Sequence, residues 1–286
     1  GATVEYSTDG GKTWSADKPV AQEGENSISV RQTDKAGNVS DSTEIKFTLD
    51  TSAPTLKITV ADGNLSAGES TTVTFTFSEA VTGFEVGDIT AVGGNLTNLQ
   101  KVNDSEWTAT FTQTGTDTPK ISVADDSYSD VAGNKGQGDS VDLNVLPVAI
   151  AGTGTTEENT VLTANLPVAT DIDGTIASYQ LVTGPDLGNG SVTVNSDGTY
   201  SFNPGNDFDN LAVGESREVS FTYTATDNDG GISAPATVTI TVTGTNDEAV
   251  ISGTATGAVT EDATVPTASG KLIVTDVDTG EAEVIA

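Results

Sequence analysis

The chain has 286 residues, and its 42 Asp and Glu residues outnumber 11 Lys and Arg residues to give a net charge of −31 at pH 7. The sequence contains neither a basic patch for phosphates nor a run of about 18 apolar residues, so we expect no nucleic-acid binding and no membrane insertion. Cysteine and histidine are absent, which excludes disulfides, typical zinc sites and the Ser-His or Cys-His arrangements of nucleophilic catalysis.

Paired carboxylates are a catalytic arrangement that this composition leaves open. Pairs of the kind used in glycoside hydrolysis occur at Glu157-Glu158 and at Asp207-Phe-Asp209. Nothing in the sequence indicates a cleft around either pair, and small β-sandwiches in series expose mostly convex surface. We therefore predict no catalytic residues and a protein that is not an enzyme.

Alternating apolar residues predict β-strands along the whole chain, each with one buried face. Turn signals such as Asp62-Gly63 and Asp197-Gly198 separate the strands, and no segment has a convincing helical period. Many short strands with frequent turns are typical of β-sandwiches, so we predict an all-β fold. In chain order, the alternating positions are Ile28 and Val30; Ile45, Phe47 and Leu49; Leu56, Ile58 and Val60; Val73, Phe75 and Phe77; Trp107, Ala109 and Phe111; Tyr200 and Phe202; Val219, Phe221 and Tyr223; and Val238, Ile240 and Val242.

Two kinds of internal repeat divide the chain into modules. The run that begins at Asp34 (Asp-Lys-Ala-Gly-Asn) recurs at Asp130 (Asp-Val-Ala-Gly-Asn), and each copy precedes one more strand and a Pro-containing junction. Further on, Asp171-Ile-Asp173 resembles Asp276-Val-Asp278. We predict the C-terminal part of a module, two complete modules and the N-terminal part of a fourth, so the chain would be a section of a longer array. The ranges are 1–50, 51–146, 147–246 and 247–286.

Short acidic clusters at strand ends, without cationic partners, indicate a divalent cation. Ca²⁺ takes six to eight oxygen ligands, several of them from Asp and Asn side chains in turns. Because self-repulsion of a polyanion opposes a compact state, bound cations would also favour folding. The alternative for any single Asp is an ordinary turn residue, since Asp and Asn favour turns for local reasons. We predict Ca²⁺ as the cofactor.

Several runs resemble known repeat families. Residues 1–146 resemble bacterial Ig-like repeats, and residues 147–286 resemble cadherin-like or VCBS repeats. The resemblance implies tandem Ig-like and cadherin-like β-sandwich modules in a linear array, from a large bacterial RTX-type surface adhesin exported by type I secretion, with Ca²⁺ at domain ends. The matching runs are Tyr6–Trp14, Val30–Asn38, Phe77–Val81, Val86–Ile89 and Asp130–Asn134 for the first family, and Thr156–Asn159, Thr170–Gly174, Gly198–Pro204, Tyr223–Gly230 and Thr243–Asp247 for the second.

The cadherin-like resemblance implies a set of calcium ligands at two junctions, with one ion expected at each. Linker residues Asp142 and Asn144 would combine with Asp171 and Asp173. Linker residues further along the chain would combine with the second Asp-x-Asp pair, and acidic residues at domain tops and ends would complete the shells. These further candidates are Asn246 and Asp247 with Asp276 and Asp278; Glu157 or Glu158; Glu261 or Asp262; and Asp227 with Asp229.

The Ig-like part offers a second group of candidate calcium ligands. Four of them crowd one loop, two could approach that loop from neighbouring strand ends, and three belong to the first module and its linker. In that order they are Asp125, Asp126, Asp130 and Asn134; Glu79 and Asp88; and Asp34, Asn38 and Asp50.

The favoured interpretation is a structural one. We predict a calcium-stiffened extender at the bacterial cell surface that projects a distal ligand-binding domain for adhesion or biofilm formation. Its partners would be calcium ions and the neighbouring modules of the same chain, and it would be a monomer. In the alternative, one sandwich itself binds a glycan or a protein, through the irregular stretch from Gly184 to Gly190 or through Trp14.

Overall fold

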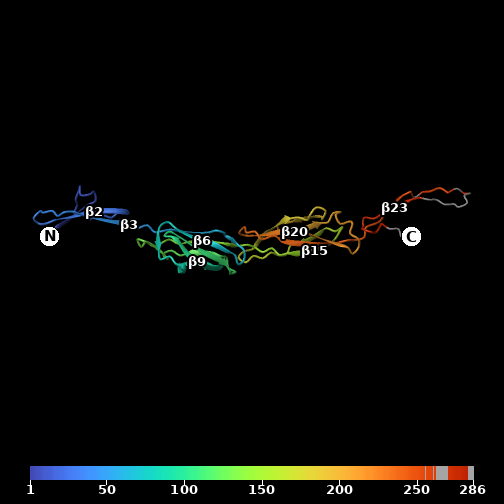
Figure 1. Cartoon of the computed structure of the whole chain (residues 1–286), viewed down its shortest axis with the longest axis horizontal. Helices are drawn as coiled ribbons and strands as arrows, with labels where there is room; N and C mark the ends of the chain where they lie inside the picture. The colour runs from blue at the N-terminus through green and yellow to red at the C-terminus, as the bar shows by residue number, and fades with distance from the viewer. Residues whose placement is uncertain (255, 260, 262–269, 283–286) are drawn as a thin grey trace. The chain divides into compact units, whose positions relative to one another are not determined.

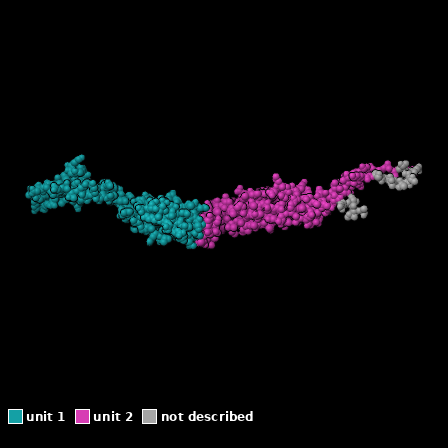
Figure 2. Space-filling model, in the orientation of Figure 1, with its two compact units in different colours: residues 1–63, 70–112, 120–142 teal, residues 64–69, 113–119, 143–286 magenta. Residues whose placement is uncertain are grey.

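The computed structural model describes residues 1–254, 256–259, 261 and 270–282. Strands occur throughout these residues, and their one helical element is a short 3₁₀ turn, Val86–Asp88. The all-β prediction is therefore confirmed (Figure 1). The chain divides into two compact units, residues 1–63, 70–112 and 120–142 and residues 64–69, 113–119 and 143–286 (Figure 2). Within the described residues no helix has the length and apolar character to cross a membrane.

The first unit begins with an antiparallel sheet of three strands, β1 (Thr3–Ser7), β2 (Gly24–Thr33) and β3 (Thr43–Leu49). Its register sets apolar residues opposite one another: Tyr6 faces Val30, and Ile28 faces Ile45. This face of the sheet is largely uncovered, because Ile45 is 51% exposed. After β1, the Asp9 carboxylate accepts hydrogen bonds from the Thr13 amide and hydroxyl at 2.9 and 2.7 Å, which closes the turn.

The remainder of the first unit contains two sheets. One consists of β4 (Leu56–Val60), β6 (Ser70–Phe77), β10 (Glu106–Gln113) and β9 (Gly94–Asn103). The other consists of β13 (Asp139–Asp142), β11 (Lys120–Val123) and β8 (Ile89–Val92). A short pair joins β7 (Val81–Thr82) to β12 (Ser129–Asp130).

Aromatic side chains form the centre of this core. Phe77 contacts Phe84, Trp107 and Tyr128 with ring centroids 5.0, 5.2 and 4.7 Å apart, in the edge-to-face arrangement that aromatic pairs favour. Trp107 is 6% exposed, as its alternation with Ala109 and Phe111 indicates.

The second unit contains a domain that, like the one just described, consists of two β-sheets around a buried core. One sheet has the order β15 (Gly152–Glu157), β21 (Ala236–Thr243), β20 (Ser216–Asp227) and β17 (Ile176–Thr183). The other has the order β16 (Leu162–Asn165), β19 (Thr199–Asn203) and β18 (Ser191–Val194). Strand β15 pairs with β21 in parallel, whereas β20 is antiparallel to β21.

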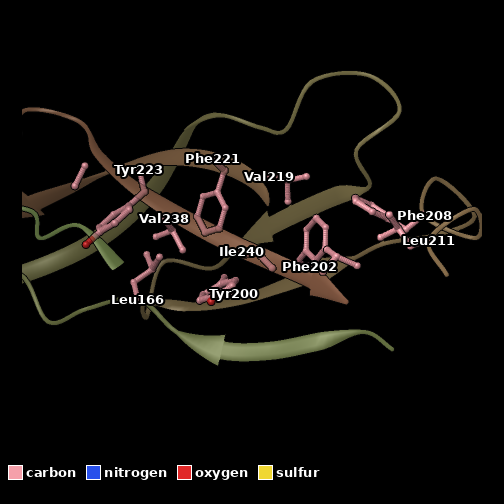
Figure 3. Close-up of a cluster of buried hydrophobic side chains, with 12 residues drawn as sticks. Leu166, Tyr200, Phe202, Phe208, Leu211, Val219, Phe221, Tyr223, Val238 and Ile240 are labelled. Carbon is pink, nitrogen blue, oxygen red and sulfur yellow. The ribbon is translucent and has the colours of Figure 1, made fainter. Parts of the chain in front are cut away.

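The core of this domain takes its residues from both sheets and from one loop. Phe221, Tyr223 and Ile240 of the first sheet belong to one buried cluster with Phe202 of the second (Figure 3). Phe208, from the loop before β20, lies with Leu211 at one end of the cluster (Figure 3). The unit also contains two short pairs: β5 (Asn64–Leu65) with β14 (Asn144–Val145), and β22 (Val250–Gly253) with β23 (Leu272–Thr275).

Candidate metal centres

Asp34, Asp130 and Asp227 each begin the same five-residue turn. In each, the Asp amide donates to the carbonyl oxygen of the fifth residue, at 2.9, 3.1 and 3.0 Å. The Asp Oδ1 atom accepts the amide of that fifth residue, at 2.8 Å in all three. The fourth residue is Gly, with φ of 89, 96 and 90°, a region that disfavours other residues. The repeated run found in the sequence is thus a repeated turn, and it has a third copy.

The second carboxylate oxygen of this turn lies beside a linker residue. Asn134 Nδ2 donates to Asp130 Oδ2 at 2.7 Å and to the Asp50 carbonyl at 3.1 Å. The third copy has Gly at the fifth position, and Asn144 Nδ2 donates to Asp227 Oδ2 at 2.9 Å in its place. Asp50 and Asn144 both belong to segments that the sequence analysis assigns to linkers. At Asp130 and Asp227 the turn therefore ties a linker to the domain that follows the linker, whereas at Asp34 the second oxygen accepts from Asn38 within the same turn.

Asp50, Glu79 and Asp130 form the Glu79 cluster, in which one oxygen of each residue lies within 4.8 Å of the others. Burial raises the pKa of the Glu79 carboxyl, and the negative charges of Asp50 and Asp130 raise it further. Asp130 is buried, and the amides of Gly133 and Asn134 donate to its Oδ1 at 2.6 and 2.8 Å. The turn thus holds Asp130 in place while its charge opposes ionisation of Glu79.

Glu158, Asp247 and Asp278 form the Glu158 cluster, again with one oxygen of each within 4.8 Å of the others. Glu158 directly follows β15 and is 0% exposed, and Asp278 is 2% exposed. Glu158 Oε1 accepts from the Thr245 amide and hydroxyl at 2.7 and 2.9 Å, and Asp278 Oδ2 accepts from the Asp247 amide at 2.9 Å. Glu158 Oε2 and Asp278 Oδ1 are buried and accept no hydrogen bond from the described residues.

Asp209 adds a further carboxylate beside the Glu158 cluster. Its Oδ1 atom is buried without a hydrogen-bond partner among the described residues. Burial raises the pKa of the Asp247 carboxyl, and the charges of Asp278 and Asp209 add to the rise. The sequence analysis did not assign Asp209 to a metal site. The usable signal was its spacing, since Asp207-Phe-Asp209 has the Asp-x-Asp pattern of the three pairs that were assigned.

Asp171 and Asp173 form the Asp173 pair, located before β17. Both carboxylate oxygens of Asp171 and the Oδ1 atom of Asp173 are buried and have no hydrogen-bond partner among the described residues. Asp173 Oδ2 accepts from the Val145 amide at 3.1 Å. Burial raises the pKa of the Asp173 carboxyl, and the charge of Asp171 adds to the rise. A side chain at Gly174 would meet Asp171 Oδ2 and Asn228 Oδ1, so another residue there would displace these side chains.

The remaining predicted ligands lie in turns, in ion pairs or on the surface. Asp142 pairs with Lys120 at 2.9 Å, and Asp88 accepts from the Glu85 amide at 2.8 Å. Glu157, next to Glu158, points outward from β15. Asp262 lies outside the described residues. Of the others, Asn38 donates to Asp34 within its turn, Asp125 accepts from Gly138, Asp126 has a φ of 66°, Asp229 accepts from Asn228, Asn246 donates to the Asp247 carbonyl, Asp276 accepts from the Asp278 amide, and Glu261 is exposed.

The donor sets of the Glu158 cluster and the Asp173 pair suit Ca²⁺. Ca²⁺ binds oxygens at 2.3–2.6 Å, so two oxygens on opposite sides of one ion lie about 5 Å apart. One oxygen of each residue of the Glu158 cluster lies within 4.8 Å of the other two, which is close enough for all three to contact a single ion. Buried carboxylate oxygens without donors are costly, and a coordinated cation removes that cost. The three carboxylates of the Glu79 cluster also lie within 4.8 Å of one another, but Asp130 there already accepts hydrogen bonds.

Trp14, the residue considered for sugar stacking, is engaged within its own sheet. The Arg31 guanidinium carbon lies 4.1 Å from the centroid of the Trp14 ring, and Trp14 Nε1 donates to the Gly11 carbonyl at 3.0 Å. Arg31 also pairs with Glu5 at 3.0 Å. One ring face of Trp14 is thereby occupied.

Comparison with protein families identifies the domains. Residues 1–51 match one model described as a bacterial Ig-like domain, residues 50–146 match another, and residues 144–244 match a bacterial cadherin-like domain. The chain therefore carries bacterial Ig-like and cadherin-like domains in tandem, consistent with a repeat region of a surface adhesin. Domains of these kinds are typically structural or adhesion modules of secreted, surface-exposed proteins, and cadherin-like domains generally bind calcium.

Solved structures show only distant similarity. The FdeC adhesin of Escherichia coli is 13% identical over 76% of this chain and 74% of its own, with a TM-score of 0.33. N-cadherin EC1-4 of Drosophila is 13% identical over 86% and 67%, with a TM-score of 0.30. InvE, an adhesin of Yersinia pseudotuberculosis, is 19% identical over 65% and 60%, with a TM-score of 0.22. At such TM-scores these similarities support no functional inference. No curated protein matches the chain in sequence.

Proposed function

We propose that the chain is a calcium-stiffened structural segment of a large bacterial surface adhesin of the RTX type, exported by type I secretion. It would project a distal ligand-binding domain from the cell for adhesion or biofilm formation. Its modules would be residues 51–146 and 147–246, with parts of further modules at 1–50 and 247–286. The tandem bacterial Ig-like and cadherin-like domains support this proposal.

The observation that carries the calcium proposal is the set of buried carboxylate oxygens without donors. Glu158 and Asp278 contribute two of them, and Asp171 and Asp173 contribute three. Bound Ca²⁺ would supply a positive charge that these oxygens share. The Glu79 cluster is proposed as a third site, supported by the closeness of its three carboxylates.

The chain's own residues connect these carboxylates to the linkers. The Val145 amide donates to Asp173, the Thr245 amide donates to Glu158, and the Asp247 amide donates to Asp278. A cation at the Asp173 pair would favour the ionised form of Asp173, whose pKa burial raises, and hydrogen bonds to charged acceptors are stronger than neutral ones. The linker backbone would then have fewer accessible conformations, and the linker would be stiffer for that reason.

The energy available is comparable with the stability of a domain. Extracellular calcium modules bind with Kd of about 10⁻⁴–10⁻³ M. An ion concentration tenfold above Kd adds about 1.4 kcal/mol for one site, and a hundredfold excess adds about 2.7 kcal/mol. Since domains unfold with about 5–15 kcal/mol, one or two sites would change the stability of a module substantially. No cysteine is present to supply disulfides for the same purpose.

The direct test is calcium titration of the full chain. Calorimetry would count the bound ions, and amide hydrogen exchange would be followed at Val145, Thr245 and Asp247 after chelation and after calcium addition. We expect at least two ions and slower exchange at all three amides. Magnesium at equal concentration is the control for general screening of the net charge. Exchange that is the same in calcium, magnesium and chelator would refute the proposal.

The alternative, in which one sandwich itself binds a glycan or protein, has less support in the described residues. Trp14 already stacks against Arg31. The stretch from Gly184 to Gly190 contributes to a polar surface hollow with Asp186 and Asn189 among its lining residues, without an exposed aromatic ring for a sugar face.

A further inference from the structure

Arg217 is the sole Lys or Arg residue between Lys135 and Lys271. It lies near the start of β20, in a domain rich in carboxylates. Its guanidinium nevertheless donates to neutral oxygens: Nη2 to the Asp207 carbonyl at 2.9 Å and to Asn210 Oδ1 at 3.1 Å, and Nη1 to Asn189 Oδ1 at 3.5 Å. The two bonds from Nη2 join β20 to the loop that contains Asp209.

The loop from Asp207 to Asn210 is fixed to its own domain on both sides. The Arg217 guanidinium carbon lies 4.4 Å from the centroid of the Phe208 ring, a cation–π contact. Phe208 is fully buried and lies with Leu211 at one end of the core (Figure 3). The Gly190 amide donates to Asp207 Oδ2 at 2.8 Å. The loop is thus anchored through Phe208, whose ring is buried in the core and contacts the Arg217 guanidinium.

The same loop offers its outward groups to the Glu158 cluster. Asp209 Oδ1 is buried without a partner among the described residues, and its charge acts on Asp247. The carbonyl oxygen of Asn210 accepts from the Thr279 hydroxyl at 2.9 Å and from the Thr279 amide at 3.3 Å. Thr279 directly follows Asp278. In this short loop, Asp209 therefore lies beside the carboxylates of the cluster, and Asn210 contacts the segment that carries Asp278.

We propose that Arg217 is a positioning residue for the cation site at the Glu158 cluster. It holds the Asp207–Asn210 loop so that Asp209 contributes its carboxylate to the cation site and the Asn210 carbonyl accepts hydrogen bonds from Thr279. This inference rests on the proposed function, because it assigns a role toward a cation bound there. Arg217 can do this without competing with the cation, since its hydrogen-bond acceptors are carbonyl and amide oxygens and the cluster's carboxylates are left to the ion.

A role of Arg217 as a nearby charge and a role as a positioning residue predict opposite changes in calcium affinity when Arg217 is replaced. If the residue acted only as a nearby positive charge, Arg217→Gln would reduce repulsion of the incoming cation and tighten binding. If it positions the loop, the same change weakens binding, and removal of an outer-shell partner typically costs 10–100-fold in metal affinity. The Arg217→Lys variant also distinguishes the charge role from the positioning role. Lys keeps the charge but lacks the planar fork that reaches two acceptors at once, so only the positioning role predicts a loss.

The experiment is a calcium titration followed by hydrogen exchange and mass spectrometry on the full chain. Peptides that cover residues 244–248 and 276–281 report on the Glu158 cluster. Peptides that cover residues 143–146 and 170–175 report on the Asp173 pair. The variants are Arg217→Lys and Arg217→Gln, with Arg31→Gln as a matched loss of one positive charge in another sheet. We expect the calcium midpoint of the first peptides to rise 10–100-fold in both Arg217 variants and to stay unchanged in Arg31→Gln.

The Asp173 pair is the internal control. It lies near Asp227, which ends β20, whereas Arg217 lies near the start of that strand. An unchanged or lower midpoint at the Glu158 cluster in Arg217→Lys overturns the proposal. An equal rise at both sites also overturns it, since Arg217 would then support the whole domain. Absence of calcium protection in the wild-type chain would instead refute the proposed function. If Arg217→Gln does not fold, the Lys variant decides alone.

Discussion

Replacing Glu158 with Gln should stabilise the calcium-free domain and remove most of its response to calcium. Glu158 Oε1 accepts two hydrogen bonds from Thr245, at 2.7 and 2.9 Å, while Oε2 is buried without a partner among the described residues. Gln keeps an oxygen for Thr245 and places an amide donor where Oε2 stood. The carboxylates of Asp247 and Asp278 lie within 4.8 Å of a Glu158 oxygen, and we expect one of them to move into hydrogen-bond distance of that amide.

The magnitude follows from the unsatisfied oxygen. A buried polar group without a partner costs about 1–3 kcal/mol, so the Gln variant should gain about that much in chelator. For a domain of about 100 residues, each kcal/mol corresponds to about 4–8 °C in melting temperature. In calcium the variant loses one charged ligand and with it up to about 2.7 kcal/mol of the stabilisation that a hundredfold excess of ion provides. Calcium binding at the Glu158 cluster should therefore add little to the melting temperature of the Glu158→Gln variant.

Differential scanning calorimetry in chelator and in calcium measures both quantities for the wild type and for Glu158→Gln. Glu157→Gln is the control, because it makes the same chemical change at the exposed neighbouring position. If Glu158→Gln is destabilised equally in chelator and in calcium, Glu158 is only a buried acceptor for Thr245 and the cation assignment is wrong.

Two further predictions concern the other site and the pH dependence. Replacing Asp171 and Asp173 with Asn should abolish calcium protection of the Val145 amide in hydrogen exchange and leave the melting of residues 51–146 unchanged; equal destabilisation of that Ig-like domain would contradict a local site. In chelator, the raised pKa values of Asp173 and Asp247 mean that the folded state binds more protons than the unfolded state. The stability that these two groups contribute is therefore present below the usual Asp pKa of about 3.9 and is lost as pH rises through their folded pKa values. Calcium binding requires the ionised carboxylates, so the calcium-dependent rise in melting temperature should grow over the same pH window; a calcium effect that does not vary between pH 3.5 and pH 7 would count against these ligands.

Strands and core residues could be predicted from sequence because strand alternation is a local property. Successive side chains of a strand point to opposite faces, so Val219, Phe221 and Tyr223 had to share a face, and all three are buried. The repeated turn was visible for the same reason, since Asp34 and Asp130 begin nearly identical runs. Its third copy at Asp227 escaped notice because Gly replaces Asn at the fifth position and Asn144, far away in sequence, donates instead.

The choice between Glu157 and Glu158 needed the tertiary structure. Alternation says that one of two adjacent residues points inward, but which one depends on how β15 pairs with β21 and on where Thr245 then lies. Asp209 is a similar case, because its loop is held by Arg217 of β20 and by the burial of Phe208 in the domain core.

From the sequence alone follow the all-β class, the order of the modules and an excess of oxygen ligands over cations, because composition and short-range periodicity carry that information. Which carboxylates converge, and which of their oxygens are left without donors, was decided by contacts between residues far apart in the chain. A cation site needs several ligands at one point in space, and no local pattern specifies such a point.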